Sequence, residues 1–271
     1  MDAQLAVVTL LGMASGGLAT ASLVGWWQAR QAYLVRANRR RRLVLALILL
    51  AMVSSLSAMA VESLTYQVWP LSSTSDVLLV CVVSALVVAL LAIRGTEAPN
   101  GLAVLAAMCS TFLVWRLAIG RGMPLDSSIH AMPKVFSLAS HLTLGCAAGI
   151  FVQVGCGAIA QLLLSAFHHP TPLVSSHQTQ ASDPVAATPD LAILGLVLLL
   201  LSLLFSTLVE LLRSGVPPIW ALPETWKVLL ALWYGTRWCA ITVLGWKGKG
   251  RFMIEAAGLI PTLALLSALV S

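Results

Sequence analysis

The stretch LAILGLVLLLLSLLFSTLVELL, residues 191–212, decides the class of protein to which this sequence belongs. Glu210 is its only charged residue. A helical apolar run of about 20 residues is long enough to cross the hydrocarbon core of a bilayer, which is about 30 Å thick. Seven other apolar runs lie on either side of it, at approximately 4–27, 43–61, 77–94, 100–119, 134–165, 226–245 and 252–270. The sequence therefore predicts an all-α fold, a polytopic transmembrane bundle of about eight helices.

The composition supports the same class over the whole length of the chain. Hydrophobic residues make up 59% of the sequence and charged residues 10%, which lies far outside the range of soluble globular domains. The only extended polar segment, 166–190, is rich in Ser, Thr, Gln, Pro and Ala. It lacks periodicity, so it is expected to be a flexible cytoplasmic linker between the fifth and sixth helices. Residues 1–271 are thus predicted to form a single integral membrane domain.

The net charge of +6 is concentrated in particular loops. The loop after the first apolar run contains Arg30, Arg36, Arg39, Arg40, Arg41 and Arg42, and the seventh loop contains Lys247, Lys249 and Arg251. Because basic loops stay on the cytoplasmic side, both termini and the loop before the seventh helix are expected on the periplasmic side of a bacterial inner (plasma) membrane. The basic residues indicate topology and contact with membrane lipid, and no nucleic-acid partner is expected.

The loop before the seventh run contains the one segment whose residue order suggests chemistry, Trp220-Ala-Leu-Pro-Glu-Thr-Trp226. Pro223 suits the first turn of a helix, and Glu224 complements the positive end of the helix dipole. From that start, Trp226, Trp233 and Arg237 fall on one helical stripe, with Trp220 in the loop above it. Each of these residues also has an ordinary structural interpretation, as an interfacial aromatic belt or a common helix start.

This ordered string resembles the tryptophan-rich haem-handling signature of the cytochrome c assembly family (CcsA/ResC/HemX-like membrane proteins). Trp220, Glu224, Thr225 and Trp226 are in register with the family pattern Trp-Asp-Pro-Lys-Glu-Thr-Trp. Residues 245–251, Gly-Trp-Lys-Gly-Lys-Gly-Arg, look like the family's Gly-Trp-Arg-Gly-Arg turn. The motif is degenerate, because Ala221 replaces the aspartate, Leu222-Pro223 replaces Pro-Lys, and no histidine follows His177.

The resemblance implies haem as a cofactor, held at the outer membrane face. In the family, a helix start after the fourth helix offers a histidine as an outer haem ligand, and His130 or Lys134 occupies that place here. His141 stands where relatives often have tyrosine, and imidazole is the usual axial ligand of haem iron. A lone histidine inside the membrane is equally typical of a hydrogen bond between helices. The implied haem contacts are His130, His141, Trp220, Glu224, Trp226, Trp233 and Arg237, with His130 and His141 as the candidate iron ligands.

Two hypotheses of function follow. The first is a haem-handling or cytochrome c assembly protein that binds or presents haem at the outer face, with an apocytochrome c or another membrane protein as partner. The second is an accessory or scaffold subunit of a membrane complex that kept the family fold and lost the haem ligands. Neither hypothesis requires an enzyme, and no Walker loop, His-Glu-x-x-His motif or Ser-His-Asp order is present in the sequence. A transporter is a third alternative, but the sequence shows no internal repeat with paired broken helices.

The polar residues inside or beside the apolar runs carry simpler expectations. Arg116 is expected to extend to the outer headgroups, and Glu62, at a helix end, to be solvated. Glu210 and Arg213 are three residues apart and able to pair. Arg237 lies deep enough to need a partner or a route to the membrane surface. The cysteines are expected to be small buried hydrophobes, because no Cys-x-x-Cys motif is present: Cys81, Cys109, Cys146, Cys156 and Cys239.

Overall fold

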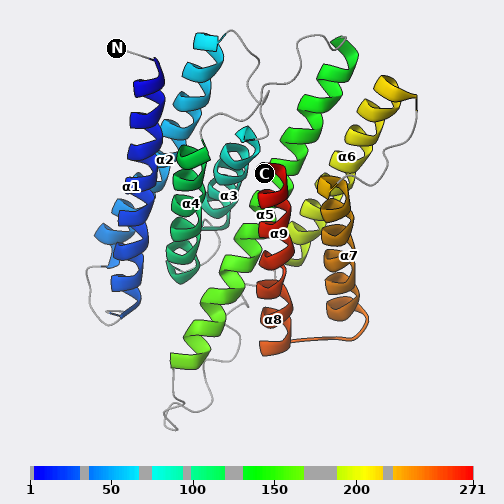
Figure 1. Ribbon diagram of the computed structural model, residues 1–271. Helices are drawn as coiled ribbons and strands as arrows, with labels where there is room; N and C mark the ends of the chain where they lie inside the picture. Colours follow the sequence, from blue (N-terminus) through cyan, green and yellow to red (C-terminus); the bar gives the residue numbers. More distant parts are fainter. Residues whose placement is uncertain are drawn as a thin grey trace.

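The computed structural model describes residues 3–30, 37–66, 75–93, 99–119, 131–167, 188–215 and 222–270 (Figure 1). The regular structure in these residues is α-helical throughout, which confirms the predicted all-α class. The helices are α1 Ala3–Arg30, α2 Ala37–Tyr66, α3 Asp76–Ile93, α4 Pro99–Ile119, α5 Ala131–Phe167, α6 Thr188–Ser214, α7 Leu222–Thr242, α8 Lys249–Ala257 and α9 Leu259–Val270. Most of the predicted linker, 168–187, lies outside the described residues, and α5 and α6 extend into its two ends.

Six segments of the described chain are long and apolar enough to cross a membrane, as expected of a multi-pass membrane protein. They are Gln4–Trp26, Arg42–Thr65, Gly101–Ile119, Pro133–Leu163, Leu191–Ser214 and Lys249–Leu269. The prediction of about eight spans is therefore met only in part. The apolar part of α3, Asp76–Leu91, is shorter than a full span, and α7, which carries Glu224, Lys227 and Arg237, is not among the six. Both helices nevertheless pack within the bundle.

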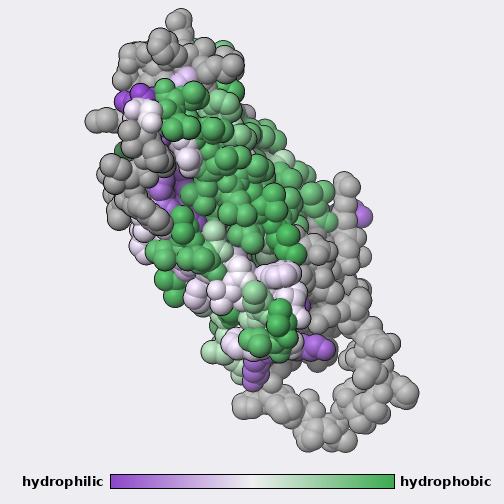
Figure 2. All heavy atoms as spheres, turned by 90° about the vertical axis from the view of Figure 1, so that its right-hand side faces the viewer, coloured by the Kyte–Doolittle hydropathy of each residue, from purple (hydrophilic) through white to green (hydrophobic). Residues whose placement is uncertain are grey.

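The outward faces of the helices have the apolar character that a lipid environment favours. On α6 the exposed residues include Leu194, Val197, Leu200, Leu204 and Leu211. Figure 2 views the side on which α6 and α7 lie in Figure 1, and hydrophobic residues cover much of the central part of this surface. A contiguous apolar surface of this kind is rare on a monomeric protein in water, so it is consistent with contact with acyl chains.

α5 is the longest helix, with 37 residues, and runs obliquely through the middle of the bundle (Figure 1). It packs against α3 and α4, which precede it in the chain, and against α6, α8 and α9, which follow it. Its approach to α3 requires glycine, because a Cβ at Gly149 would lie 2.0 Å from Ser84 Oγ and 2.6 Å from the carbonyl oxygen of Cys81. In lipid no hydrophobic effect draws helices together, so the van der Waals attraction of such close contacts contributes to their packing instead.

Phe151 of α5 connects three helices. Its ring stacks on the ring of Tyr234 in α7, with the centroids 3.7 Å apart. On α6, a Cβ at Gly195 would lie only 2.6 Å from the Phe151 ring. The missing side chain of Gly195 therefore provides the space in which the ring lies, and one aromatic residue fixes the positions of α6 and α7 relative to α5.

The final apolar run, predicted as one helix over 252–270, is divided into α8 and α9 at Gly258. Pro261 explains the division, because proline has no amide hydrogen to donate to the carbonyl group of Ala257 and its ring crowds that group. Hydrogen bonds continue across the break, from Gly258 N–H to Ile254 O at 3.2 Å and from Thr262 N–H to Gly258 O at 3.4 Å. The two segments are thus the parts of one kinked helix.

Candidate functional site

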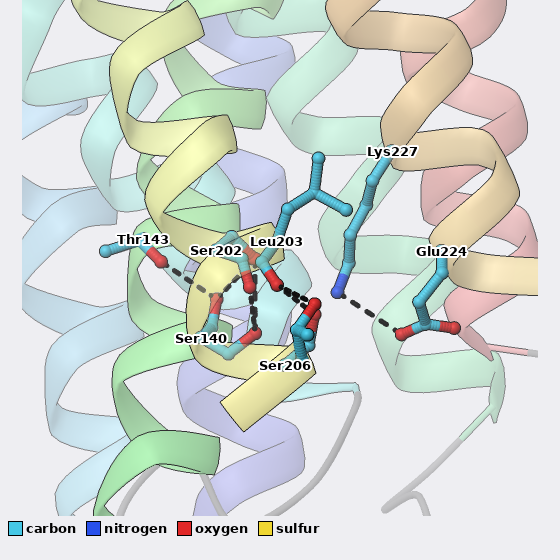
Figure 3. Close-up of polar contacts among 8 residues, drawn as sticks. Ser140, Thr143, Ser202, Leu203, Ser206, Glu224 and Lys227 are labelled. Atoms are coloured by element: carbon cyan, nitrogen blue, oxygen red, sulfur yellow. Dashed lines mark hydrogen bonds and ion pairs between the residues drawn. The ribbon is translucent and has the colours of Figure 1, made fainter. Parts of the chain in front are cut away.

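The first turns of α7 hold a cation inside the protein. The helix begins at Leu222, which confirms the predicted helix start, and Glu224 lies in its first turn. Lys227 follows one turn later and has only 3% of its surface exposed. Its Nζ lies 3.6 Å from Glu224 Oε1, and Figure 3 shows its side chain extending from α7 toward α6. Trp226, the next residue back along the chain, is partly buried and packs against the hydrophobic core.

Hydroxyl groups join α5 to α6 beside this lysine (Figure 3). Ser140 Oγ donates to Ser202 O at 3.1 Å, and Ser202 Oγ donates to Ser140 O at 3.0 Å. Thr143 Oγ1 donates to Ser140 O at 3.1 Å, and Ser206 Oγ donates to Leu203 O at 3.1 Å. Each hydroxyl has a backbone acceptor. The two bonds between Ser140 and Ser202 hold the helices together, whereas the Thr143 bond lies within α5 and the Ser206 bond within α6.

Arg237, farther along α7, is paired with a buried carboxylate. Its Nη2 lies 2.5 Å from Glu255 Oε1 on α8, and Arg251 Nε lies 3.1 Å from the same oxygen. Arg237 and Glu255 are each 1% exposed. The expectation that Arg237 needs a partner is confirmed, although the partner was not predicted. The available signal was Glu255 itself, a carboxylate inside an apolar run, since ionisable groups in spans are usually paired.

Trp233 and Tyr234 bring polar atoms close to the kink between α8 and α9. A Cβ at Gly258 would lie 2.9 Å from Tyr234 Oη and 3.1 Å from Trp233 Nε1. Position 258, at the kink, therefore needs glycine, because two aromatic side chains approach its backbone closely. Within the described residues, Trp233 Nε1 and Arg237 Nε have no hydrogen-bond partner.

A second buried ion cluster lies where α2, α3 and α4 meet. Arg116 Nη2 lies 3.0 Å from Glu62 Oε2 and 3.5 Å from Asp76 Oδ1, and Arg116 is 2% exposed. The expectations that Arg116 extends to the headgroups and that Glu62 is solvated are therefore wrong. An arginine that stays inside a membrane protein needs paired charges. Two carboxylates on neighbouring helices provide them here.

Two smaller expectations are not fully met. Arg213 is exposed, and no ion pair joins it to Glu210 among the described residues. Cys239 is exposed and Cys146 is partly buried, whereas the expectation of buried thiols holds for Cys81, Cys109 and Cys156. The part of the chain that the structure describes contains no group of three His, Cys, Asp or Glu side chains able to hold a metal ion.

The candidate haem contacts come from two separate packing interfaces. His141 is partly buried on α5, one turn before Gly145, and a Cβ at Gly145 would lie 2.6 Å from Val80 Cβ of α3. Glu224, Trp226, Trp233 and Arg237 belong to α7, which packs against α6 and α9. His130 and Trp220 lie outside the described residues.

The α7 residues also differ in depth. Eleven residues separate Trp226 from Arg237, which corresponds to about 16 Å along a helix. Arg237 therefore lies toward the α8 end of α7, and Trp226, Lys227 and Glu224 lie at its start.

Comparisons with protein-family models, with curated proteins and with solved structures find no match to this chain.

The residues at the start of α7 fit the edge of a haem group in two respects. The partly buried Trp226 offers an aromatic surface for the macrocycle, and the buried ammonium group of Lys227 offers a partner for a propionate carboxylate. His141 is the only histidine in the described part of the chain, and it belongs to the other interface. Within the described residues, the start of α7 therefore offers groups suited to the ring and to a propionate, and it includes no histidine for the iron.

Proposed function

We propose that the protein is a haem-handling membrane protein of the cytochrome c assembly type, which binds or presents haem at the membrane face where α7 begins. The observation that carries the proposal is the buried Lys227 beside Trp226 and Glu224 in the first turns of that helix. Glu224 and Trp226 belong to the string that resembles the family's haem-handling signature, and Lys227 directly follows it. An aromatic surface and a cation that is shielded from water suit the two ends of haem, the apolar ring and the propionates.

In this proposal each residue at the start of α7 has a distinct task. Trp220 and Trp226 cover the ring, Lys227 pairs with a propionate in place of Glu224, and His130 coordinates the iron. The site faces the periplasm of a bacterial inner membrane, with both chain termini on that side, and an apocytochrome c or another membrane protein receives the haem. Holding haem for transfer needs no catalytic group, so the proposal is not one of an enzyme.

The test is a pyridine haemochrome assay, with an absorption spectrum, on the detergent-purified protein. We expect near-stoichiometric haem in the parent protein and a large loss in Trp226→Ala and in Trp220→Ala/His130→Ala. Trp238→Ala is the matched control, because Trp238 lies on the same helix but is exposed. A folded, monodisperse parent protein without haem would contradict the proposal, as would an equal loss in the Trp238→Ala control.

The second candidate function, an accessory or scaffold subunit without haem, is favoured by a specific observation. Arg237 is already neutralised by Glu255, a structural role that needs no cofactor. His141 lies on α5, one turn before Gly145, which packs closely against α3 and not against α7. This candidate predicts a haem-free protein that purifies with a stable membrane partner. The same purification therefore distinguishes the two functions.

A further inference from the structure

We propose that the turn between α7 and α8 is a binding surface for the headgroups of anionic phospholipids. The turn comprises residues 243–248, and with Lys249, the first residue of α8, it combines apolar with cationic side chains. Val243 is 73% exposed, Leu244 67% and Trp246 46%. Lys247 and Lys249 are exposed beside them. Apolar anchors next to two cations suit a ligand that has both acyl chains and a negative charge.

The backbone gives this surface a defined shape. At the end of α7, Leu244 N–H donates to Cys239 O at 3.2 Å and Trp246 N–H donates to Ala240 O at 3.1 Å. Gly245 and Gly248 have φ values of 67° and 59°, in the left-handed region that residues with a Cβ avoid. The two glycines therefore bracket Trp246 and Lys247 in a tight connection, and α8 begins directly after the second one.

The two lysines carry charges that the described protein does not neutralise. Within the described residues, neither Lys247 nor Lys249 forms an ion pair with a carboxylate. Glu255, the acidic residue of α8, is occupied by Arg237 and Arg251. A headgroup with a net negative charge complements two such cations, whereas a zwitterionic headgroup brings a cation of its own.

The position of the turn identifies the source of the anion as a lipid of the surrounding leaflet. Lys249 is the first residue of the candidate span Lys249–Leu269, so the turn lies at the end of the bundle, at the level of the headgroups. Tryptophan is enriched at this level of a membrane. The exposed Val243 and Leu244 need an apolar neighbour, which acyl chains provide and a soluble phosphate does not.

Titration of the detergent-purified, full-length protein with phosphatidylglycerol, followed by native mass spectrometry, tests this proposal. We expect Lys247→Gln/Lys249→Gln to weaken binding on the order of thirtyfold, which corresponds to about 1 kcal/mol for each lysine. Lys247→Arg/Lys249→Arg should bind like the parent protein. Because all these side chains are exposed, the variants should fold normally, and thermal unfolding checks this.

Two controls make the experiment decisive. Arg213→Gln removes an exposed cation from the last turn of α6, at the end of the bundle opposite the α7–α8 turn (Figure 1). This variant should leave phosphatidylglycerol binding unchanged. Phosphatidylcholine should bind the parent and the double variant equally. Unchanged phosphatidylglycerol affinity in the double variant would overturn the proposal, and so would an equal loss of affinity for phosphatidylcholine or in Arg213→Gln. The outcome is independent of whether the protein binds haem.

Discussion

Replacing Glu255 by glutamine is expected to destabilise the bundle strongly. Glu255 and Arg237 are both buried, and Glu255 Oε1 accepts hydrogen bonds from Arg237 and from Arg251. A hydrogen bond to a charged group contributes about 1.5–3 kcal/mol, and removal of one partner from a buried ion pair costs about 3–5 kcal/mol. At roughly 2–4 °C for each kcal/mol in a chain of this size, the expected decrease in Tm is about 10 °C.

Thermal unfolding in detergent, followed by fluorescence-detected size exclusion, measures this effect. Glu210→Gln is the matched control, since Glu210 is a partly buried glutamate on α6 with no ion pair among the described residues. The double variant Arg237→Met/Glu255→Met should lose less stability than the sum of the losses in Arg237→Met and Glu255→Met. The reason is that it leaves neither member of the pair as an unpaired buried charge. The reasoning would be refuted if Glu255→Gln were as stable as Glu210→Gln, or if the two single effects were additive.

The remaining predictions concern other contacts of the bundle. Glu62→Gln should lower the Tm more than Asp76→Asn, because Arg116 Nη2 lies 3.0 and 3.1 Å from the two Glu62 oxygens but 3.5 Å from Asp76 Oδ1; the reverse order in thermal unfolding would contradict this. Gly149→Ala should destabilise the protein by about 2 kcal/mol, because the added Cβ would overpack against α3. Gly157→Ala is the control and should be nearly neutral, because its Cβ would meet nothing within 4 Å. Equal Tm values for the two variants would argue against the close approach of α5 to α3. A maleimide should modify the native protein first at Cys239, as intact mass spectrometry would show, and Cys239→Ser should remove that fast reaction; faster labelling of a buried thiol would exclude this packing of the helices.

The positions of the helices could be predicted because the membrane constrains both their length and their composition. The run 191–212 lies within α6, Thr188–Ser214, and the run 100–119 nearly coincides with α4, Pro99–Ile119. The start of α7 was predictable from Pro223 and Glu224, since both residues are typical of a first helical turn. The division of the last helix at Gly258 was missed, although Pro261 was a visible signal for a kink.

The partners of the buried charges could not be predicted, because they depend on which helices are neighbours. Arg116 is separated in sequence by 54 residues from Glu62 and by 40 from Asp76, and nothing within one helix indicates that α2, α3 and α4 meet. For the same reason, the sequence did not indicate that Gly145, one turn after His141, packs closely against α3. The positions of single helices could thus be predicted from the sequence, whereas the contacts between helices could be identified only from the structure.

The central position of α5 has a consequence for the biosynthesis of the protein. Among the described helices, α1 to α4 form one set, which packs on α5 through α3 and α4. The helices α6 to α9 form a second set, which packs on α5 mainly through α6, α8 and α9, and contacts between the two sets are at most marginal. A ribosome delivers the helices in that same order. The first four can reach their final packing as soon as α5 has entered the membrane, and each later helix then adds to a neighbour already in place. The order of the helices in the chain is therefore also a feasible order of assembly.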